Sequence, residues 1–289
     1  MKKTATRQNR KPIFVVLIPR FEDVANSFYS GEVMRGANFA ASRLDVDLLI
    51  HMVDRKDHSH WLEGIVDPFL ISGILFADID RDWDVVGKAI RGGVPALVLN
   101  NTSDDPFSTI SIDNKSAAIQ AVTYLAGLGH KRIGTIAGDL NTQAGQDRLA
   151  GYYEGLERAG LPKDKTLVKK GGFLRTPARS AAGALLSLKA AKRPTAIFAA
   201  SDVMAYEAID VAKALRIAVP GDLSVVGFDK NLEAGEDGVR LTTFEQPILD
   251  MARLGIETLY QMSLGLAKLP VKMTLQAKLV KGKSTGKAS

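Results

Sequence analysis

The chain has 289 residues, of which 46% are hydrophobic, so it can bury one large core or two ordinary ones. It contains no cysteine, which excludes disulfides, thiolate catalysis and cysteine-based zinc sites. There are 38 basic and 32 acidic residues, a net charge of +6.

The excess positive charge is confined to the two ends of the chain. Residues 1–12 hold five basic residues and residues 278–289 hold four, and neither segment contains an acidic residue. Without these nine, the body carries 29 basic against 32 acidic residues. A DNA-binding groove requires clustered Lys and Arg on a folded surface, so we expect the body alone to bind nucleic acid weakly.

The basic first twelve residues lack the apolar run of a secretory signal. No segment approaches the uninterrupted apolar length of a membrane span. The sequence therefore predicts a soluble, cytoplasmic protein with no membrane partner.

Short apolar, β-branched runs alternate with longer amphipathic stretches in the first part of the chain. Strands are predicted at 13–18, 46–52, 73–76 and 95–99, and helices at 28–44, around 58–70 and at 82–91. Pro19 ends the first strand. The alternation of strands with helices predicts a parallel, doubly wound sheet.

The same alternation begins again after residue 113. Helices are predicted at 114–128, 146–159, 178–188, 202–215 and 248–264, strands at 133–137, 167–170, 196–199 and 224–228, and an extended segment at 271–281. Gly129 and Gly160 each follow a predicted helix end. Two α/β units without a flexible linker between them predict two lobes that share several crossovers.

Several motifs in the sequence could suggest a catalytic or metal site, but the other residues that such a site requires are missing. Gly282-Lys283-Ser284 resembles a phosphate loop, but Ala277 stands where the loop needs glycine. His58 and His60, two residues apart, do not share a helical face and fit a solvated surface. No nucleophile with a general base is recognisable. The sequence therefore predicts a binding protein that is not an enzyme, with no cofactor and no metal.

Seven segments in order resemble the effector-binding core of the LacI/GalR family of transcription regulators. They are Asn26–Tyr29 with Val33–Gly36, Ser111–Asn114 with Leu125–Gly134, Arg148–Tyr152, Arg193–Asp202, Val219–Asp229, Leu241–Pro247 and Leu279–Thr285. The resemblance implies the type I periplasmic-binding-protein-like fold, in which three crossovers join two doubly wound parallel-sheet lobes. It places 13–112 with 245–271 in an N-terminal lobe and 113–244 with 272–289 in a C-terminal lobe.

The chain departs from this family at its start. A regulator of the family begins with a helix-turn-helix and a hinge helix, whereas residues 1–12 resemble only a basic remnant of the linker. We expect a fragment of a longer repressor, with a natural sensor lacking a DNA reader as the alternative. The loop from Pro19 to Phe28 is also longer than usual, and Ser201 stands where Asn is common.

Ligands of open α/β sheets bind beyond the carboxyl ends of the strands, which selects ten candidate residues. They are Phe28, Tyr29, Asn100, Asp113, Arg148, Phe173, Ser201, Asp202, Asp229 and Gln246. Their carboxylates, amides, guanidinium and aromatic faces suit a polyol. The resemblance favours Phe28, Asp113, Arg148, Phe173 and Asp229. Each has a structural alternative: core packing for the two Phe, a helix cap for Asp113, a surface ion pair for Arg148 and a turn for Asp229.

The resemblance implies an allosteric sensor whose effector is a sugar or sugar derivative, with a nucleoside less favoured. It further implies a homodimer through the helices near 28–43 and 202–215. Operator DNA would be bound only through an upstream helix-turn-helix outside this sequence. A solute-binding protein for sugar uptake is the first alternative, and an enzyme of the doubly wound class is the second.

Overall fold

The computed structural model describes residues 10–19, 27–54, 57, 60–231 and 240–288, and the chain divides into two compact units. Unit 1 takes in the chain up to Ser111 together with Pro247–Leu275, and unit 2 takes in Ile112–Gln246 together with the chain from Gln276. The chain therefore passes between the units three times. Within the described residues, no helix combines the length and the apolar character needed to cross a membrane.

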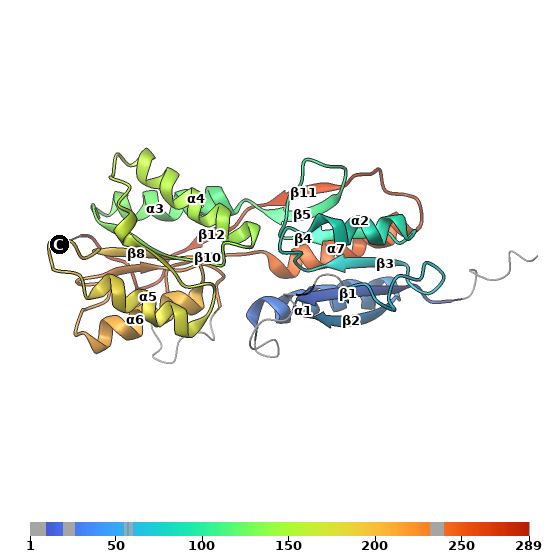
Figure 1. Ribbon diagram of the computed structural model, residues 1–289, viewed down its shortest axis with the longest axis horizontal. Coiled ribbons are helices and arrows are strands. Elements are labelled where there is room, and N and C mark those ends of the chain that lie inside the picture. Colours follow the sequence, from blue (N-terminus) through green and yellow to red (C-terminus); the bar gives the residue numbers. More distant parts are fainter. Residues whose placement is uncertain (1–9, 20–26, 55–56, 58–59, 232–239, 289) are drawn as a thin grey trace, which may run out of the picture. The chain divides into compact units, whose positions relative to one another are not determined.

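Unit 1 is built on a six-stranded sheet in the order β11-β5-β4-β3-β1-β2 (Figure 1). The strands are β1 (Ile13–Pro19), β2 (Asp47–Val53), β3 (Gly73–Phe76), β4 (Ala96–Leu99), β5 (Ser108–Ile112) and β11 (Lys272–Leu275). The helices are α1 (Phe28–Leu44), α2 (Trp83–Arg91) and α7 (Ile248–Ser263). Neighbouring strands from β2 to β5 are parallel.

Both faces of this sheet are covered, and successive residues of a strand pack in opposite directions. Ile74 and Phe76 of β3 belong to a buried cluster with Val85 of α2. Leu75, between them, lies against α7, because a Cβ added at Gly255 would come within 2.7 Å of it. This two-sided burial explains why the strands are unbroken apolar runs instead of alternating patterns.

Unit 2 has a parallel four-stranded sheet in the order β7-β6-β8-β9 and an antiparallel pair, β10-β12. The strands are β6 (Ile133–Ala137), β7 (Val168–Lys170), β8 (Ala196–Ala199), β9 (Ser224–Val226), β10 (Thr243–Glu245) and β12 (Lys278–Val280). The helices are α3 (Asn114–Gly127), α4 (Gln143–Arg158), α5 (Arg175–Leu186) and α6 (Asp202–Ala214). Helices α3 and α4 lie on one side of the sheet, and α5 and α6 on the other (Figure 1).

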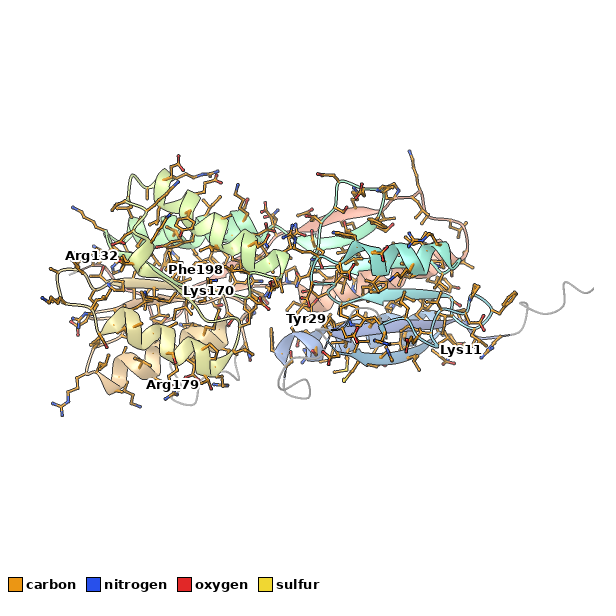
Figure 2. The ribbon with its side chains drawn as sticks, viewed as in Figure 1. Lys11, Tyr29, Arg132, Lys170, Arg179 and Phe198 are labelled. Atoms are coloured by element: carbon orange, nitrogen blue, oxygen red, sulfur yellow. The ribbon has the colours of Figure 1, made fainter. Side chains whose placement is uncertain are left out.

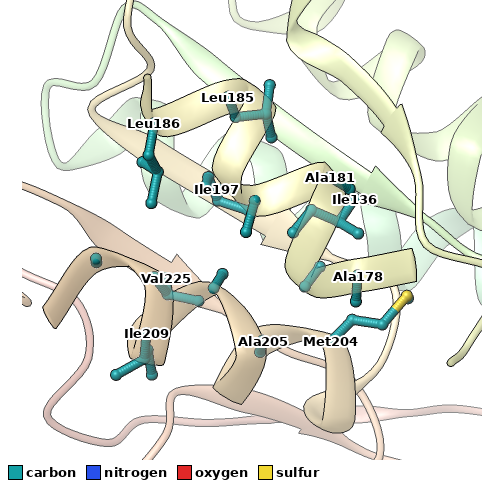
Figure 3. Packing of buried hydrophobic residues seen from close by; sticks show 14 of the residues in the cluster. Ile136, Ala178, Ala181, Leu185, Leu186, Ile197, Met204, Ala205, Ile209 and Val225 are labelled. Atoms are coloured by element: carbon teal, nitrogen blue, oxygen red, sulfur yellow. The ribbon is translucent and has the colours of Figure 1, made fainter. Parts of the chain in front are cut away.

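The face under α5 and α6 carries a dense apolar core. Ile136, Ile197 and Val225 of three neighbouring strands pack against the two helices (Figure 3). The helices contribute chiefly small residues, such as Ala181 and Ala205, so their backbones approach the sheet closely. The core thus holds the ends of these strands, where the polar candidates lie, in fixed positions.

Ser284 and His130 fix the segment after β12 onto unit 2. Ser284 Oγ donates to Val225 O at 2.6 Å and accepts from Thr242 N at 2.9 Å. The buried His130 ring lies 2.9 Å from Ser224 Oγ and 3.2 Å from the carbonyl oxygen of Gly286. Gly282-Lys283-Ser284 is thus part of the packing of unit 2, and residues 285–288 after it form no helix.

The structure corrects the helix predicted around 58–70, because residues 60–70 form a series of turns. Gly64 has φ +69°, outside the helical region, and Pro68 cannot donate an intrahelical hydrogen bond. The buried Trp61 instead donates its indole N–H to Asp54 O at 2.6 Å. His58, most of the basic segment 1–12 and most of the loop from Pro19 to Phe28 lie outside the described residues.

Three strands were not anticipated as separate elements. β5 and β10 fall in regions for which no strand was predicted. The extended segment predicted at 271–281 is in fact two strands, β11 in the sheet of unit 1 and β12 in unit 2. Residues 272–275 accordingly belong to unit 1.

Two glycines of α1 should respond in opposite ways to replacement by alanine. A Cβ at Gly36 would lie 2.1 Å from Leu249 O in α7, whereas nothing lies within 4 Å of a Cβ at Gly31. We expect Gly36→Ala to lower the free energy of unfolding by about 1–3 kcal/mol through overpacking. Gly31→Ala should raise it by about 0.5 kcal/mol through helix propensity. Urea unfolding of both variants measures this, and equal effects would contradict the close packing of α1 on α7.

Candidate functional site

Unit 2 brings five of the predicted residues into one cluster near the carboxyl ends of its strands, and one of them, Gln246, follows β10 and binds Asp229. Phe173 follows β7, Asp202 follows β8, Asp229 follows β9, and Arg148 reaches them from α4. The strands are parallel, so the segments that follow them emerge at one edge of the sheet. The cluster lies entirely within unit 2.

Arg148 is the centre of this cluster and is only 3% exposed. Its Nε donates to Asn114 Oδ1 at 2.8 Å, and its Nη1 donates to the carbonyl oxygen of Ala200 at 2.6 Å. Nη1 also lies 3.9 Å from Asp229 Oδ1. Burial lowers the pKa of Arg148 to about 10, against the opposing effect of Asp229 and two other carboxylates. The guanidinium thus remains charged at neutral pH, in a fixed orientation.

Two aromatic rings cover the guanidinium of Arg148. Its carbon Cζ lies 3.8 Å from the ring centre of Phe228 and 5.7 Å from that of Phe173. Such contacts stabilise a buried cation through the negative face of the ring. Gly138 makes room for Phe173, because a Cβ there would lie 2.1 Å from Phe173 Cζ.

The two carboxylates are held in different ways. Asp229 accepts a hydrogen bond from the side-chain amide of Gln246 and lies 3.4 Å from the backbone N of Asp202. Asp202 accepts from Thr243 Oγ1 at 2.6 Å and from the backbone N of Asn231 at 2.7 Å. Burial raises the pKa of both carboxyl groups, and the charge of Asp229 adds to the effect at Asp202. The hydrogen bonds of Asp202 thus fix the segments around the cluster that contain Asn231 and Thr243.

Two other predicted residues cap helices. Ser201 Oγ accepts from Met204 N at 3.4 Å at the start of α6. Asp113 Oδ1 accepts from Ser116 N at 2.9 Å at the start of α3, so Asp113 has the helix-capping role that was its predicted alternative. Asp113 also precedes Asn114, which holds Arg148, so this cap supports the cluster indirectly.

The remaining three predicted residues, Phe28, Tyr29 and Asn100, belong to unit 1. Phe28 is half-buried and begins α1. Tyr29, labelled in Figure 2, donates its hydroxyl to Ala77 O after β3. Burial, followed by the charge of Asp78, raises its pKa well above the ordinary value. Asn100 follows β4, is 8% exposed, and has an Oδ1 without a hydrogen-bond partner among the described residues.

Strained backbone marks several of these positions. Asn100 and Phe173 both have φ +65°, and Asp229 has φ +135°. Residues other than glycine rarely adopt such angles, and each costs about 1–3 kcal/mol where it occurs. Surrounding contacts must compensate for that cost, a pattern that is concentrated at functional sites.

Three contributors to the cluster were missing from the predicted site. Phe228 was predicted only as the last residue of a strand, and Thr243 lies in β10, where no strand was predicted. Asn114 was placed with Asp113 at the crossover but was not among the ten predicted ligand-binding residues. The spacing of a strand does not separate a core aromatic ring from one that stacks on a cation. The one sequence feature that could have indicated a role for Phe228 in the site is its position directly before Asp229 at the end of a predicted strand.

His60 is exposed and pairs with Asp57 at 2.7 Å and with Glu63 at 3.4 Å. In the described part of the chain, no three His, Cys, Asp or Glu side chains gather in a way that could hold a metal ion. The cluster around Arg148 offers hydrogen-bond donors, acceptors and apolar ring faces, which suits binding of a small polar molecule.

The similarity to known proteins extends over almost the whole chain. The profile of a family described as "Periplasmic binding protein-like domain" matches residues 122–285, more than half of the sequence. The HTH-type transcriptional regulator DegA of Bacillus subtilis is 31% identical over 270 residues, which cover 91% of this chain and 78% of DegA.

Solved structures share the fold. The complex of the transcriptional regulator CelR with cellobiose is similar with a TM-score of 0.87 at 28% identity, covering 96% of this chain and 85% of that one. A LacI transcriptional regulator from a Rhodococcus species is similar with a TM-score of 0.80 at 26% identity, covering 95% and 98%.

The raised carboxyl pKa values predict a dependence of stability on pH. A folded carboxyl group with a raised pKa binds more protons than the unfolded chain, so stability falls as pH rises above about 4. Asp202→Asn should flatten that fall, because the amide carries no charge; its oxygen can accept from Asn231 N while its NH₂ group donates to Thr243 Oγ1. Asp210→Asn, a half-exposed position on the same helix, is the control and should keep the wild-type slope. Urea unfolding between pH 4 and 8 measures both, and equal slopes would show that Asp202 carries no buried charge.

Proposed function

Because the chain belongs to the LacI family of transcription regulators, we propose that it senses a small hydroxylated effector and passes that signal to operator DNA. The effector would contact Arg148, Phe173, Asp229 and Gln246 of unit 2. Phe28, Tyr29 and Asn100 of unit 1 would close over its other side. The proposed role is binding and release, without turnover of the ligand.

The burial of Arg148 is the observation that supports this proposal most. A charged guanidinium is costly to bury, and Nη2 of Arg148 makes no hydrogen bond to the described residues, so a polar ligand would supply the acceptor that this group lacks. The fork of Arg148 and the carboxylate of Asp229 suit vicinal hydroxyl groups. Phe173 would cover the apolar face of a ring.

A sugar or sugar derivative is the class of effector that we favour. The CelR complex contains cellobiose and is similar to this chain over nearly its whole length. A nucleoside is the second candidate, since flat aromatic faces also stack on a base. The similarity to DegA over 91% of the chain favours a regulator over a sugar-uptake protein.

We propose that the effector shifts an equilibrium between open and closed arrangements of the two units. The three passages of the chain near 111, 246 and 275 would act as the hinge. The regulator would work as a cytoplasmic homodimer through α1 and α6. Its DNA-reading helix-turn-helix would precede residue 12, and two-fold symmetry would match a palindromic operator.

Removing the guanidinium should weaken binding strongly. Arg148→Ala leaves Asp229 without its counter-charge and a ligand hydroxyl without its partner, so we expect a loss of about 2 kcal/mol or more in affinity. Thermal-shift screening of sugars, polyols and nucleosides, cellobiose included, identifies a ligand, and calorimetry measures its affinity. Arg158→Ala is the matched control on the same helix, because Arg158 is exposed and pairs only with Glu154 among the described residues. Unchanged affinity in both Arg148→Ala and Asp229→Ala would remove these residues from the site.

Closure predicts a more compact protein in the presence of ligand. Small-angle scattering with a ligand already shown to bind by calorimetry should give a smaller radius of gyration than without it. Arg148→Ala at the same ligand concentration should keep the larger value. Compaction that fails to occur at saturating ligand would refute the closure mechanism.

A further inference from the structure

The polar atoms that the candidate binding residues leave open include two amide oxygens. Gln246 Oε1 is buried and has no hydrogen-bond partner within the described chain, like Asn100 Oδ1 in unit 1. The amide nitrogen of Gln246 binds Asp229, and a carboxylate only accepts, which fixes the orientation of the amide. An amide oxygen is satisfied only by an O–H or N–H donor. A ligand that reaches either oxygen would therefore need to donate a hydrogen bond to it.

Carboxylates are prominent in the segments that follow the strands of unit 2. Asp139 follows β6, Asp202 follows β8 and Asp229 follows β9. In unit 1 the buried Asp78 follows β3 and is held by the backbone N of Ile79 at 2.7 Å. An anion that approaches the strand ends of either unit would therefore meet negative charge.

The cations beside these carboxylates are already engaged. Lys230 Nζ binds Glu245 at 2.7 Å. Arg148 gives Nε to Asn114 and Nη1 to a backbone carbonyl, and its charge is shared with the nearby carboxylates. Lys170 ends β7 but is exposed, so water and salt screen its charge (Figure 2). Apart from the exposed Lys170, only Nη2 of Arg148 among these three cations makes no hydrogen bond to the described residues, and one such group gives a phosphate dianion few donors.

From this arrangement we propose that the site takes an uncharged ligand rich in hydroxyl or amino-type N–H donors and rejects its phosphorylated or carboxylated derivatives. This inference rests on the proposed function, because it concerns the same site. An anion would lose its hydration beside Asp229 and Asp202 and would gain only the charge of Arg148, which Asp229 already opposes, whereas neutral hydroxyls would satisfy the open oxygens. Rejection by unpaired or like charges is a common source of specificity.

Matched pairs of compounds test the proposal directly. Calorimetry on the whole chain compares glucose with glucose 6-phosphate and glucuronate, cellobiose with its 6′-phosphate, and adenosine with AMP. For any pair whose neutral member binds, we expect the anionic member to bind at least about tenfold more weakly. Equal or tighter binding of an anionic member would overturn the proposal.

A variant that removes one charge shows whether anions are rejected by electrostatic repulsion or because they do not fit the site sterically. Asp229→Asn keeps the size of the side chain and removes one negative charge, so the ratio of neutral to anionic affinity should fall by about tenfold. Asp210→Asn removes a charge from the same unit on the exposed side of α6 and should leave the ratio unchanged. A ratio unaffected by Asp229→Asn would show that the carboxylate does not select against anions.

Titration with inorganic phosphate tests the rejection of anions without an identified effector. At constant ionic strength the melting temperature of the wild-type chain should show no saturable rise with phosphate, whereas Asp229→Asn should show one. A saturable rise in the wild type that Arg148→Met abolishes would overturn the proposal. If phosphate is rejected but no neutral compound binds, the rejection of anions stands while the proposed sensing function fails.

Discussion

The burial of one guanidinium, that of Arg148, constrains the positions of several segments of unit 2. Arg148 is 3% exposed, so the structure must supply the hydrogen bonds and the counter-charge that water would otherwise give it. Asn114, the carbonyl oxygen of Ala200 and the Asp229 carboxylate supply them, each from a different segment. A single cation thereby ties together the start of α3, the end of β8 and the end of β9. Such a tie makes the positions of these three segments depend on one another.

The backbone around this cation is organised to make the contacts possible. Asp229 adopts a strained φ, and the carboxylate so placed accepts from Gln246, the last residue of unit 2 before the chain returns to unit 1. Gly227 is needed beside it, because a Cβ there would lie 2.2 Å from Asp202 Oδ1. The strain is local, and the hydrogen bonds of Asp202 and Gln246 compensate for it.

Sequence patterns predicted the parts of the structure in which burial follows a simple period. β3, β6 and β8 begin and end at the predicted residues, because each is an apolar run covered on both faces. The segment 60–70 failed because its apolar residues have helical spacing, while Gly64 and Pro68 impose turns. β5, with the sequence Ser-Thr-Ile-Ser-Ile, was missed because hydroxyl side chains conceal a strand that is nonetheless buried. Arg148, Phe173 and Asp229 could be placed at strand ends, but the stacking of Phe228 on Arg148 depends on tertiary geometry that no local pattern encodes.

The order in which the chain supplies its strands has a consequence for synthesis. β11 lies at one edge of the sheet of unit 1, and β12 is the partner of β10 in unit 2, yet only a few residues separate them near the end of the sequence. A ribosome therefore releases neither unit in finished form until residues 272–280 have emerged, long after β1 and β6 have been made. Until then the nascent protein would expose an unpaired strand edge in each half, the kind of surface that chaperones shield.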